Sequence, residues 1–162
     1  MDLAVLPEHL LEQPQFDRCG RALVLSDRFV GAVWTGHPYR GTELTPEVLA
    51  RYPMLSYAPH DGISHLDRSL ARVGVHARTG ATTANVAVIP YALEETHLVT
   101  LLPERMASRL AGGADIRILE PTFPLAAVRQ FAVWHEVHES DPAHTWLRGQ
   151  IVEMSGLVAR VG

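Results

Sequence analysis

One short segment of this sequence places hydroxyl and amide side chains where an extended run meets a helical pattern. In Thr82-Thr83-Ala84-Asn85, the side chains of Thr83 and Asn85 and the backbone of Ala84 are able to hydrogen-bond a carboxylate or a carbonyl. The free N–H groups and positive dipole end of a helix start favour such an anion. Simple N-capping by Thr83 or Asn85 explains the same residues, and both roles are compatible.

A second segment with the same placement runs from Met54 through Tyr57 to Ser64. A turn at His60, Asp61 and a glycine follows a strand-like run there, and Ser64 precedes a helical pattern. The alternative is that Met54 belongs to the core and that His60 and Asp61 form only a solvent-exposed turn. Pro7 follows an earlier strand, so it either lines a binding site or forms a turn. These residues complete our set of candidate ligand contacts.

Metal binding and catalysis have less support. The run His135-Glu136-Val137-His138 spaces its histidines three apart, whereas a zinc-binding His-Glu-x-x-His helix needs a spacing of four. The nearby Asp141 and His144 add no recognised ligand spacing. Cys19 lies in a polar stretch with no evident histidine partner. Because nucleophile, phosphate-loop and dinucleotide motifs are also missing from the sequence, we expect no metal, cofactor or catalytic residue.

Composition limits the function classes further. The 162 residues are 47% hydrophobic and 20% charged, which is typical of a globular chain with one domain or two small lobes. The 14 basic residues are all dispersed arginines against 18 acidic ones, so we expect no direct contact with nucleic acid. No apolar run reaches the ~18 residues of a membrane span, and no signal-peptide pattern opens the chain. A cytoplasmic protein without membrane association is therefore expected.

Apolar runs alternate with helical patterns along the chain. Strands are expected at residues 2–6, 21–25, 29–34, 54–57, 98–102, 116–119 and 128–134, with an extended segment at 76–83. Helices are expected after a Thr45 cap, over 63–73 with Gly74 as C-cap, over 85–94 with a bend at Pro90, over 104–110, and from Asp141 to about 154. This alternation predicts an α/β fold with mostly parallel strands. We expect Trp146, on the last helix, to pack against a sheet.

Six short motifs occur in an order that is informative as a whole. They are Asp2-Leu3-Ala4-Val5, the strand 29–34 with Gly36-His37-Pro38, the helix end 67–74, the strand 96–103, Trp134-His135, and the run from Asp141-Pro142 to Trp146-Leu147-Arg148. This order resembles the effector-binding domain of LysR-type transcription regulators. The last two motifs resemble most closely the subgroup of nodulation regulators and regulators of aromatic-compound degradation.

The resemblance implies a two-lobed fold like that of type 2 periplasmic binding proteins. Residues 1–35 and 122–156 would form the first α/β lobe, residues 36–121 the second, and residues 157–162 a tail. The family implies a small, aromatic or carboxylated effector bound in a cleft between the lobes, and a homodimer formed through the lobes. It also implies that no bond is made or broken, so we expect no enzyme activity.

The sequence departs from this family in three respects. A winged helix-turn-helix domain with its linker helix, and further strand–helix units, precede the position of Asp2 in the family, so the first lobe is expected to be incomplete. A histidine commonly stands at the position of Met54 in the regulators that sense aromatic compounds.

Two alternatives to a sensor remain open. One is a small α/β hydrolase that uses the cluster between His135 and His144, and the other is a fragment that only dimerises.

Overall fold

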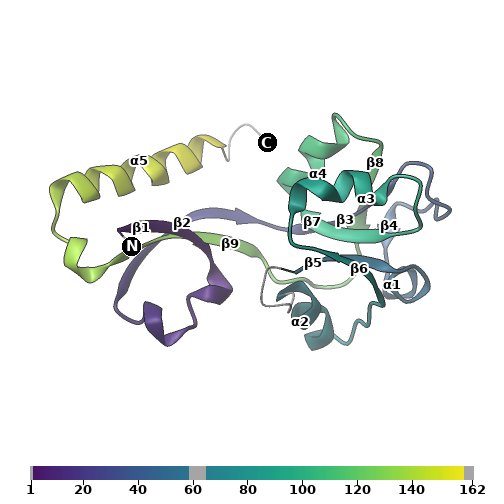
Figure 1. Cartoon of the computed structure of the whole chain (residues 1–162), viewed down its shortest axis with the longest axis horizontal. Helices are drawn as coiled ribbons and strands as arrows, with labels where there is room; N and C mark the ends of the chain where they lie inside the picture. Colours follow the sequence, from purple (N-terminus) through teal and green to yellow (C-terminus); the bar gives the residue numbers. More distant parts are fainter. Residues whose placement is uncertain (1, 59–64, 159–162) are drawn as a thin grey trace. The chain divides into compact units, whose positions relative to one another are not determined.

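The computed structural model describes residues 2–58 and 65–158. The chain divides into two compact units, one formed by residues 1–27 and 127–162 and the other by residues 28–126 (Figure 1). A single residue, Arg28, separates strand β2 (Cys19–Asp27) from strand β3 (Phe29–Trp34), so the chain enters the second unit there without a loop. The side chain of Arg28 forms ion pairs with Glu104 and Glu120, which fasten this entry point to the second unit.

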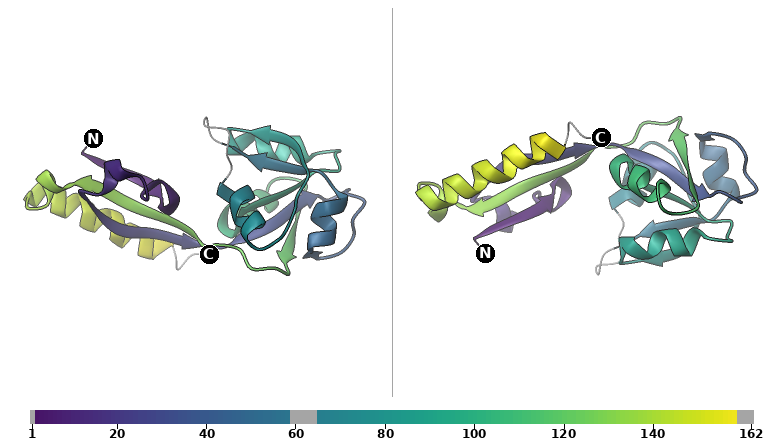
Figure 2. Two further views of the ribbon diagram at one scale, coloured as in Figure 1. Left: turned by 90° about the horizontal axis from the view of Figure 1, so that it is seen from below. Right: turned by 90° about the horizontal axis from the view of Figure 1, so that it is seen from above.

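The first unit is a three-stranded antiparallel sheet in the order β1-β9-β2, with β1 spanning Leu3–Pro7 and β9 spanning Val128–His135. Helix α5 (Pro142–Val158) lies along one face of this sheet, and the short 3-10 helices η1 (Glu8–Leu10) and η2 (Pro14–Phe16) lie on the other (Figure 2). Asp141 caps α5 as expected, because its carboxylate accepts hydrogen bonds from the N–H groups of Ala143 at 2.8 Å and His144 at 3.3 Å.

The expected packing of Trp146 is wrong. Its side chain is 67% exposed, and the inward position on α5 belongs instead to Arg148, which is 9% exposed. The guanidinium of Arg148 lies 4.4 Å from the ring centre of Trp134 on β9. Two residues are separated by about 200° around a helix, so burying Arg148 turns Trp146 toward solvent.

The second unit contains a six-stranded sheet in the order β4-β8-β3-β7-β5-β6. Its other strands are β4 (Glu43–Leu44), β5 (Met54–Tyr57), β6 (Thr79–Thr83), β7 (Val99–Pro103) and β8 (Ile116–Pro121). Strand β3 is antiparallel to both of its neighbours, whereas the pairs β4–β8, β5–β6 and β5–β7 are parallel. The expectation of mostly parallel strands is therefore wrong for the first unit and for β3. The chain enters β3 directly from the first unit, so no β-α-β crossover sets its direction.

Helices cover both faces of this sheet. Helix α1 (Pro46–Arg51) and helix α2 (His65–Arg72) pack on one face, and helix α3 (Ile89–Leu93) with helix α4 (Glu104–Ala111) on the other. Strand β3 contributes side chains to both faces of the sheet. Val33 packs in the core beneath α1 and α2, whereas Val30 and Ala32 pack in the core beneath α3 and α4.

Local signals for helix ends are confirmed in three places. The hydroxyl of Thr45 accepts a hydrogen bond from the N–H of Val48 at 3.4 Å, and Gly74 has the positive φ, 73°, of a helix C-cap. Pro90 divides the helical pattern 85–94 into the 3-10 helix η3 (Val86–Val88) and α3, in which it occupies the first turn.

A fully buried histidine, His37, lies in the loop after β3. Its Nδ1 accepts a hydrogen bond from the backbone N–H of Tyr39 at 3.1 Å. Its ring packs edge-on against the ring of Tyr52, with the ring centres 4.6 Å apart. Burial lowers the pKa of His37 below the ordinary value of 6.5, and the positive charges of Arg117 and Arg40 act in the same direction. Burial thus disfavours the protonated form of His37.

Candidate functional site

The carboxyl ends of β5 and β6 bring the candidate residues of the second unit to one edge of its sheet. The two strands pair in parallel, with Tyr57 opposite Thr83, and the N–H of Ala58 donates to the carbonyl of Thr83 at 3.0 Å. Strand β7 is also parallel to β5. Ligands of open α/β sheets bind at such an edge, beyond the carboxyl ends of the parallel strands.

Thr83 and Asn85 both take part in the local turn that follows β6. The Thr83 hydroxyl accepts from the N–H of Asn85 and donates to its carbonyl, both at 3.1 Å. The side-chain oxygen of Asn85 accepts from the N–H of Ala87 at 2.9 Å and so caps η3. Within residues 2–58 and 65–158, the Asn85 side-chain NH₂ group has no hydrogen-bond partner. Two donors of Asn85 thus remain for an exogenous oxygen atom.

The other candidates are placed differently. Met54 is 1% exposed and belongs to the core on the α1–α2 face. Ala84 is exposed and offers only backbone groups. Pro7 ends β1 in the first unit and is half-buried. His60, Asp61 and Ser64 lie outside the described residues. The structure therefore brings together Thr83, Ala84 and Asn85, and does not bring Met54 to the surface beside them.

Tyr57, which lies within the segment from Met54 to Ser64 but is not among the candidate contacts predicted from the sequence, is a further group at this edge. It is the last residue of β5, its side chain is exposed, and the strand register places it beside Thr83. One residue earlier, the buried Ser56 donates a hydrogen bond to the carboxylate of Asp67 on α2 at 3.1 Å. Burial raises the pKa of Asp67, and the hydrogen bond from Ser56 opposes that rise. Its place beside Thr83 follows from the strand register, which the local sequence pattern does not specify.

The sequence model of one known family, described as LysR substrate binding domain, matches residues 1–156. The chain belongs to this family. Its solved structural neighbours are LysR regulatory domains, and the expected fold, like that of type 2 periplasmic binding proteins, is confirmed.

Individual relatives of this LysR substrate-binding domain agree with the family match. The HTH-type transcriptional regulator SyrM 1 of Sinorhizobium fredii is 27% identical over 81% of the chain and 39% of its own length. The probable transcriptional regulator PA0477 of Pseudomonas aeruginosa has a TM-score of 0.80 at 22% identity, over 93% of the chain and 49% of the neighbour. The effector binding domain of QuiR in complex with shikimate has a TM-score of 0.75 at 16% identity, over 96% of the chain and 72% of the neighbour. The chain thus spans well under two thirds of the length of SyrM 1.

In this LysR domain, the side chains of His135, His138 and His144 make ring-stacking and helix-capping contacts. The rings of His138 and His144 stack with centres 4.6 Å apart and planes at 10°, and the ring of His135 caps the 3-10 helix η4 (Glu136–His138) by accepting from Val137. Over residues 2–58 and 65–158, no three His, Cys, Asp or Glu side chains are placed to hold a metal ion. Cys19 stands opposite His135 in the pairing of β2 with β9. The family match does not favour the hydrolase alternative.

No helix within the described part of the chain combines the length and the apolar character needed to span a membrane.

Proposed function

We propose that the chain senses a small carboxylated effector, which it binds at the β5–β6 edge of the second unit. The family match supports a sensor, and QuiR, a neighbour in fold, has been captured with shikimate, a hydroxylated carboxylate. The observation that carries the proposal is the Asn85 side chain. Its oxygen is occupied by the cap of η3, while both of its N–H donors have no partner among the described residues, and Asn85 follows closely after Thr83, which pairs with Tyr57.

In this proposal each group at the edge has a separate task. The Asn85 amide donates to one oxygen of the effector carboxylate, and the backbone of Ala84 lies beside it. Thr83 holds the turn through its two hydrogen bonds to Asn85, so it positions the amide. The exposed Tyr57 offers a ring face for an aromatic or cyclic body and a hydroxyl for its polar substituents. No bond of the effector is broken.

The substitution Asn85→Asp tests this assignment. Aspartate keeps the oxygen that caps η3, but it removes both N–H donors and adds a negative charge against the carboxylate. We expect the variant to melt within about 1 °C of the wild type, because the capping oxygen is retained. Its affinity should fall by at least tenfold, because a hydrogen bond to a charged group contributes about 1.5–3 kcal/mol.

The measurement is isothermal titration calorimetry of the 162-residue chain with shikimate, benzoate and salicylate, beside a thermal melt. Asn85→Ser is the matched control that keeps a capping hydroxyl without adding charge, and it should give an intermediate loss of affinity. Undiminished affinity in Asn85→Asp would move the site away from this edge. Failure of all three carboxylates to bind would contradict the proposed effector class.

The role of the whole regulator follows from the same proposal. Effector binding shifts the regulator between two conformational states in proportion to its differential affinity for them, and so changes the output of the DNA-binding part. We further propose that the regulator works in the cytoplasm as a homodimer, in line with its family.

A further inference from the structure

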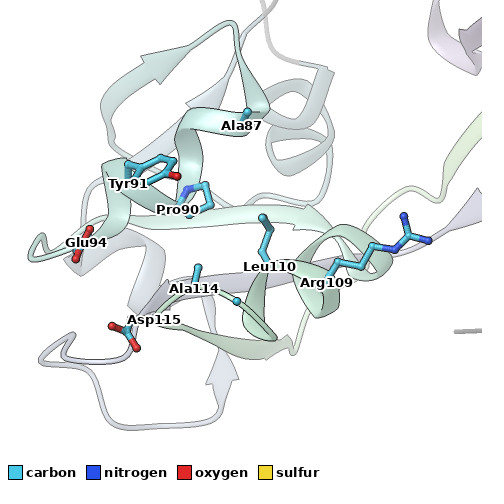
Figure 3. A pocket seen from close by; sticks show the side chains of 9 residues that line it. Ala87, Pro90, Tyr91, Glu94, Arg109, Leu110, Ala114 and Asp115 are labelled. Atoms are coloured by element: carbon cyan, nitrogen blue, oxygen red, sulfur yellow. The ribbon is translucent and has the colours of Figure 1, made fainter.

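A surface cavity of about 500 Å³ lies on the second unit, between α3 and α4 (Figure 3). One wall is a single helical face, formed at spacings of three and four by Ala87, Pro90, Tyr91 and Glu94. The other wall is the end of α4 with the turn that follows it, and it provides Arg109, Leu110, Gly113, Ala114 and Asp115. Thr83, Asn85 and Tyr57 are not part of this lining. The cavity is therefore distinct from the group of residues to which we assign the effector.

The two ends of the cavity differ in charge. The carboxylates of Glu94 and Asp115 lie at one end, whereas the guanidinium of Arg109 extends away from the other end (Figure 3). Neither carboxylate has a hydrogen-bond or ion-pair partner in the described parts of the chain, residues 2–58 and 65–158. The C-terminal end of α4, where the helix dipole is negative, comes shortly before Asp115 in the chain. The acidic end of the cavity therefore attracts a positive charge.

Apolar and aromatic groups line the rest of the cavity. Between the charged ends, Pro90 faces Leu110 and Ala114 and forms an apolar floor with them (Figure 3). The ring of Tyr91 stands beside this floor and is 77% exposed, more than any other large hydrophobic side chain of the described residues. A tyrosine ring attracts a cation to its face and packs against an apolar body. An ammonium group on an apolar body matches the floor, the ring and the acidic end together.

We propose that this α3–α4 cavity binds a small organic cation, a primary amine carried on an aromatic or alicyclic body. The ammonium group pairs with Glu94 and Asp115, and the body packs on Pro90 and Leu110 beside the ring of Tyr91. The volume of the cavity lies in the range that small ligands occupy in proteins. The chain thus has a second binding site, for a molecule opposite in charge to the proposed effector.

An organic cation accounts for these groups better than other occupants do. An anion would approach two unpaired carboxylates, while Arg109, the basic residue of the lining, is directed away from the cavity. A metal ion has too few ligands here, since the described residues place no three His, Cys, Asp or Glu side chains to hold one. A lysine side chain of another protein carries the same ammonium group, but its linear stem covers less of the apolar floor.

A two-dimensional NMR titration of the isotope-labelled 162-residue chain with 2-phenylethylamine tests the site. We expect saturable shifts of the backbone signals of α3 and the end of α4. The dissociation constant should be roughly micromolar to millimolar, because the two carboxylates are exposed. The neutral 2-phenylethanol and the anionic 3-phenylpropanoate should each bind about tenfold or more weakly. Nα-acetyl-lysine amide, which represents a lysine side chain, should also bind more weakly than 2-phenylethylamine.

Substitutions assign the binding to the named groups. The double variant Glu94→Gln/Asp115→Asn keeps the shape of both side chains and removes both charges, so it should weaken amine binding by about tenfold or more. Tyr91→Ala should weaken it by about two- to fivefold, since a cation on an exposed ring contributes that much. The matched control is Glu95→Gln, because Glu95 is exposed and adjacent but does not line the cavity. It should change the affinity by less than about twofold.

Two more variants separate this proposal from its alternatives. Arg109→Gln should not weaken amine binding, because the guanidinium is directed away from the cavity. Asn85→Asp should also leave it unchanged, so the effector site and the amine site fail or succeed independently. Thermal melts confirm that each variant is folded. The proposal is overturned if the amine gives no saturable shifts, if binding survives the loss of both carboxylates, or if the alcohol, the anion or the lysine amide binds as tightly.

Discussion

Replacing Arg148 by methionine is expected to destabilise the first unit by about 3.5–4 kcal/mol. The guanidinium donates to the carbonyls of His138 at 2.9 Å and Glu139 at 3.0 Å, and to the hydroxyl of Thr145 at 3.0 Å. It also stacks on Trp134. Two hydrogen bonds from a charged donor to backbone carbonyls contribute about 1.5 kcal/mol each, and the stacking adds roughly 0.5–1 kcal/mol. Methionine fills similar space but donates no hydrogen bond.

The matched control is Arg18→Met in the same unit. Arg18 forms an exposed ion pair with Glu136, and such a pair contributes about 0–1 kcal/mol. Urea unfolding followed by circular dichroism measures the free energy of unfolding of both variants. Arg148→Lys should recover only part of the loss, because an ammonium cannot reproduce the planar fork that reaches both carbonyls. If Arg148→Met is no less stable than Arg18→Met, then Arg148 does not fasten the turn between η4 and α5.

Two further predictions concern the second unit. Because burial lowers the pKa of His37, the unfolded chain binds the proton more tightly, so stability is full above about pH 6.5 and falls as the pH drops below it. Urea titrations from pH 7.5 to 5 should show the free energy of unfolding falling as the pH drops, with a slope from this one group of at most ~1.4 kcal/mol per pH unit, and His37→Asn should remove that part of the slope. Glu95 has a positive φ of 54°, which glycine adopts without strain, so Glu95→Gly should raise the free energy of unfolding by about 0.5–1 kcal/mol. Glu94→Gly, at an ordinary φ of −56°, should give no gain in the same thermal melts, and equal effects at the two positions would contradict the strain argument.

The elements of the second unit were largely predictable from local pattern. The strand expected at 29–34 is β3 without change of bounds, and the helix expected over 104–110 is α4, longer by one residue. The caps at Thr45 and Asp141 were predictable because capping uses side chains and N–H groups two or three residues apart. The candidate residues Thr83 and Asn85 were found by the same kind of signal, a polar group between a strand and a helix start.

The sequence by itself determined which segments are strands or helices, where several helices begin and end, and, through the order of six motifs, the family. Tertiary structure alone decided the direction of β3, the exposure of Trp146, the position of Tyr57 beside Thr83, and the meeting of Glu94, Arg109 and Asp115 around one hollow. The physical reason is the range of the interactions. Caps and periodicity act within one or two turns of the chain, whereas strand register and the choice of the buried helix side depend on packing partners distant in sequence.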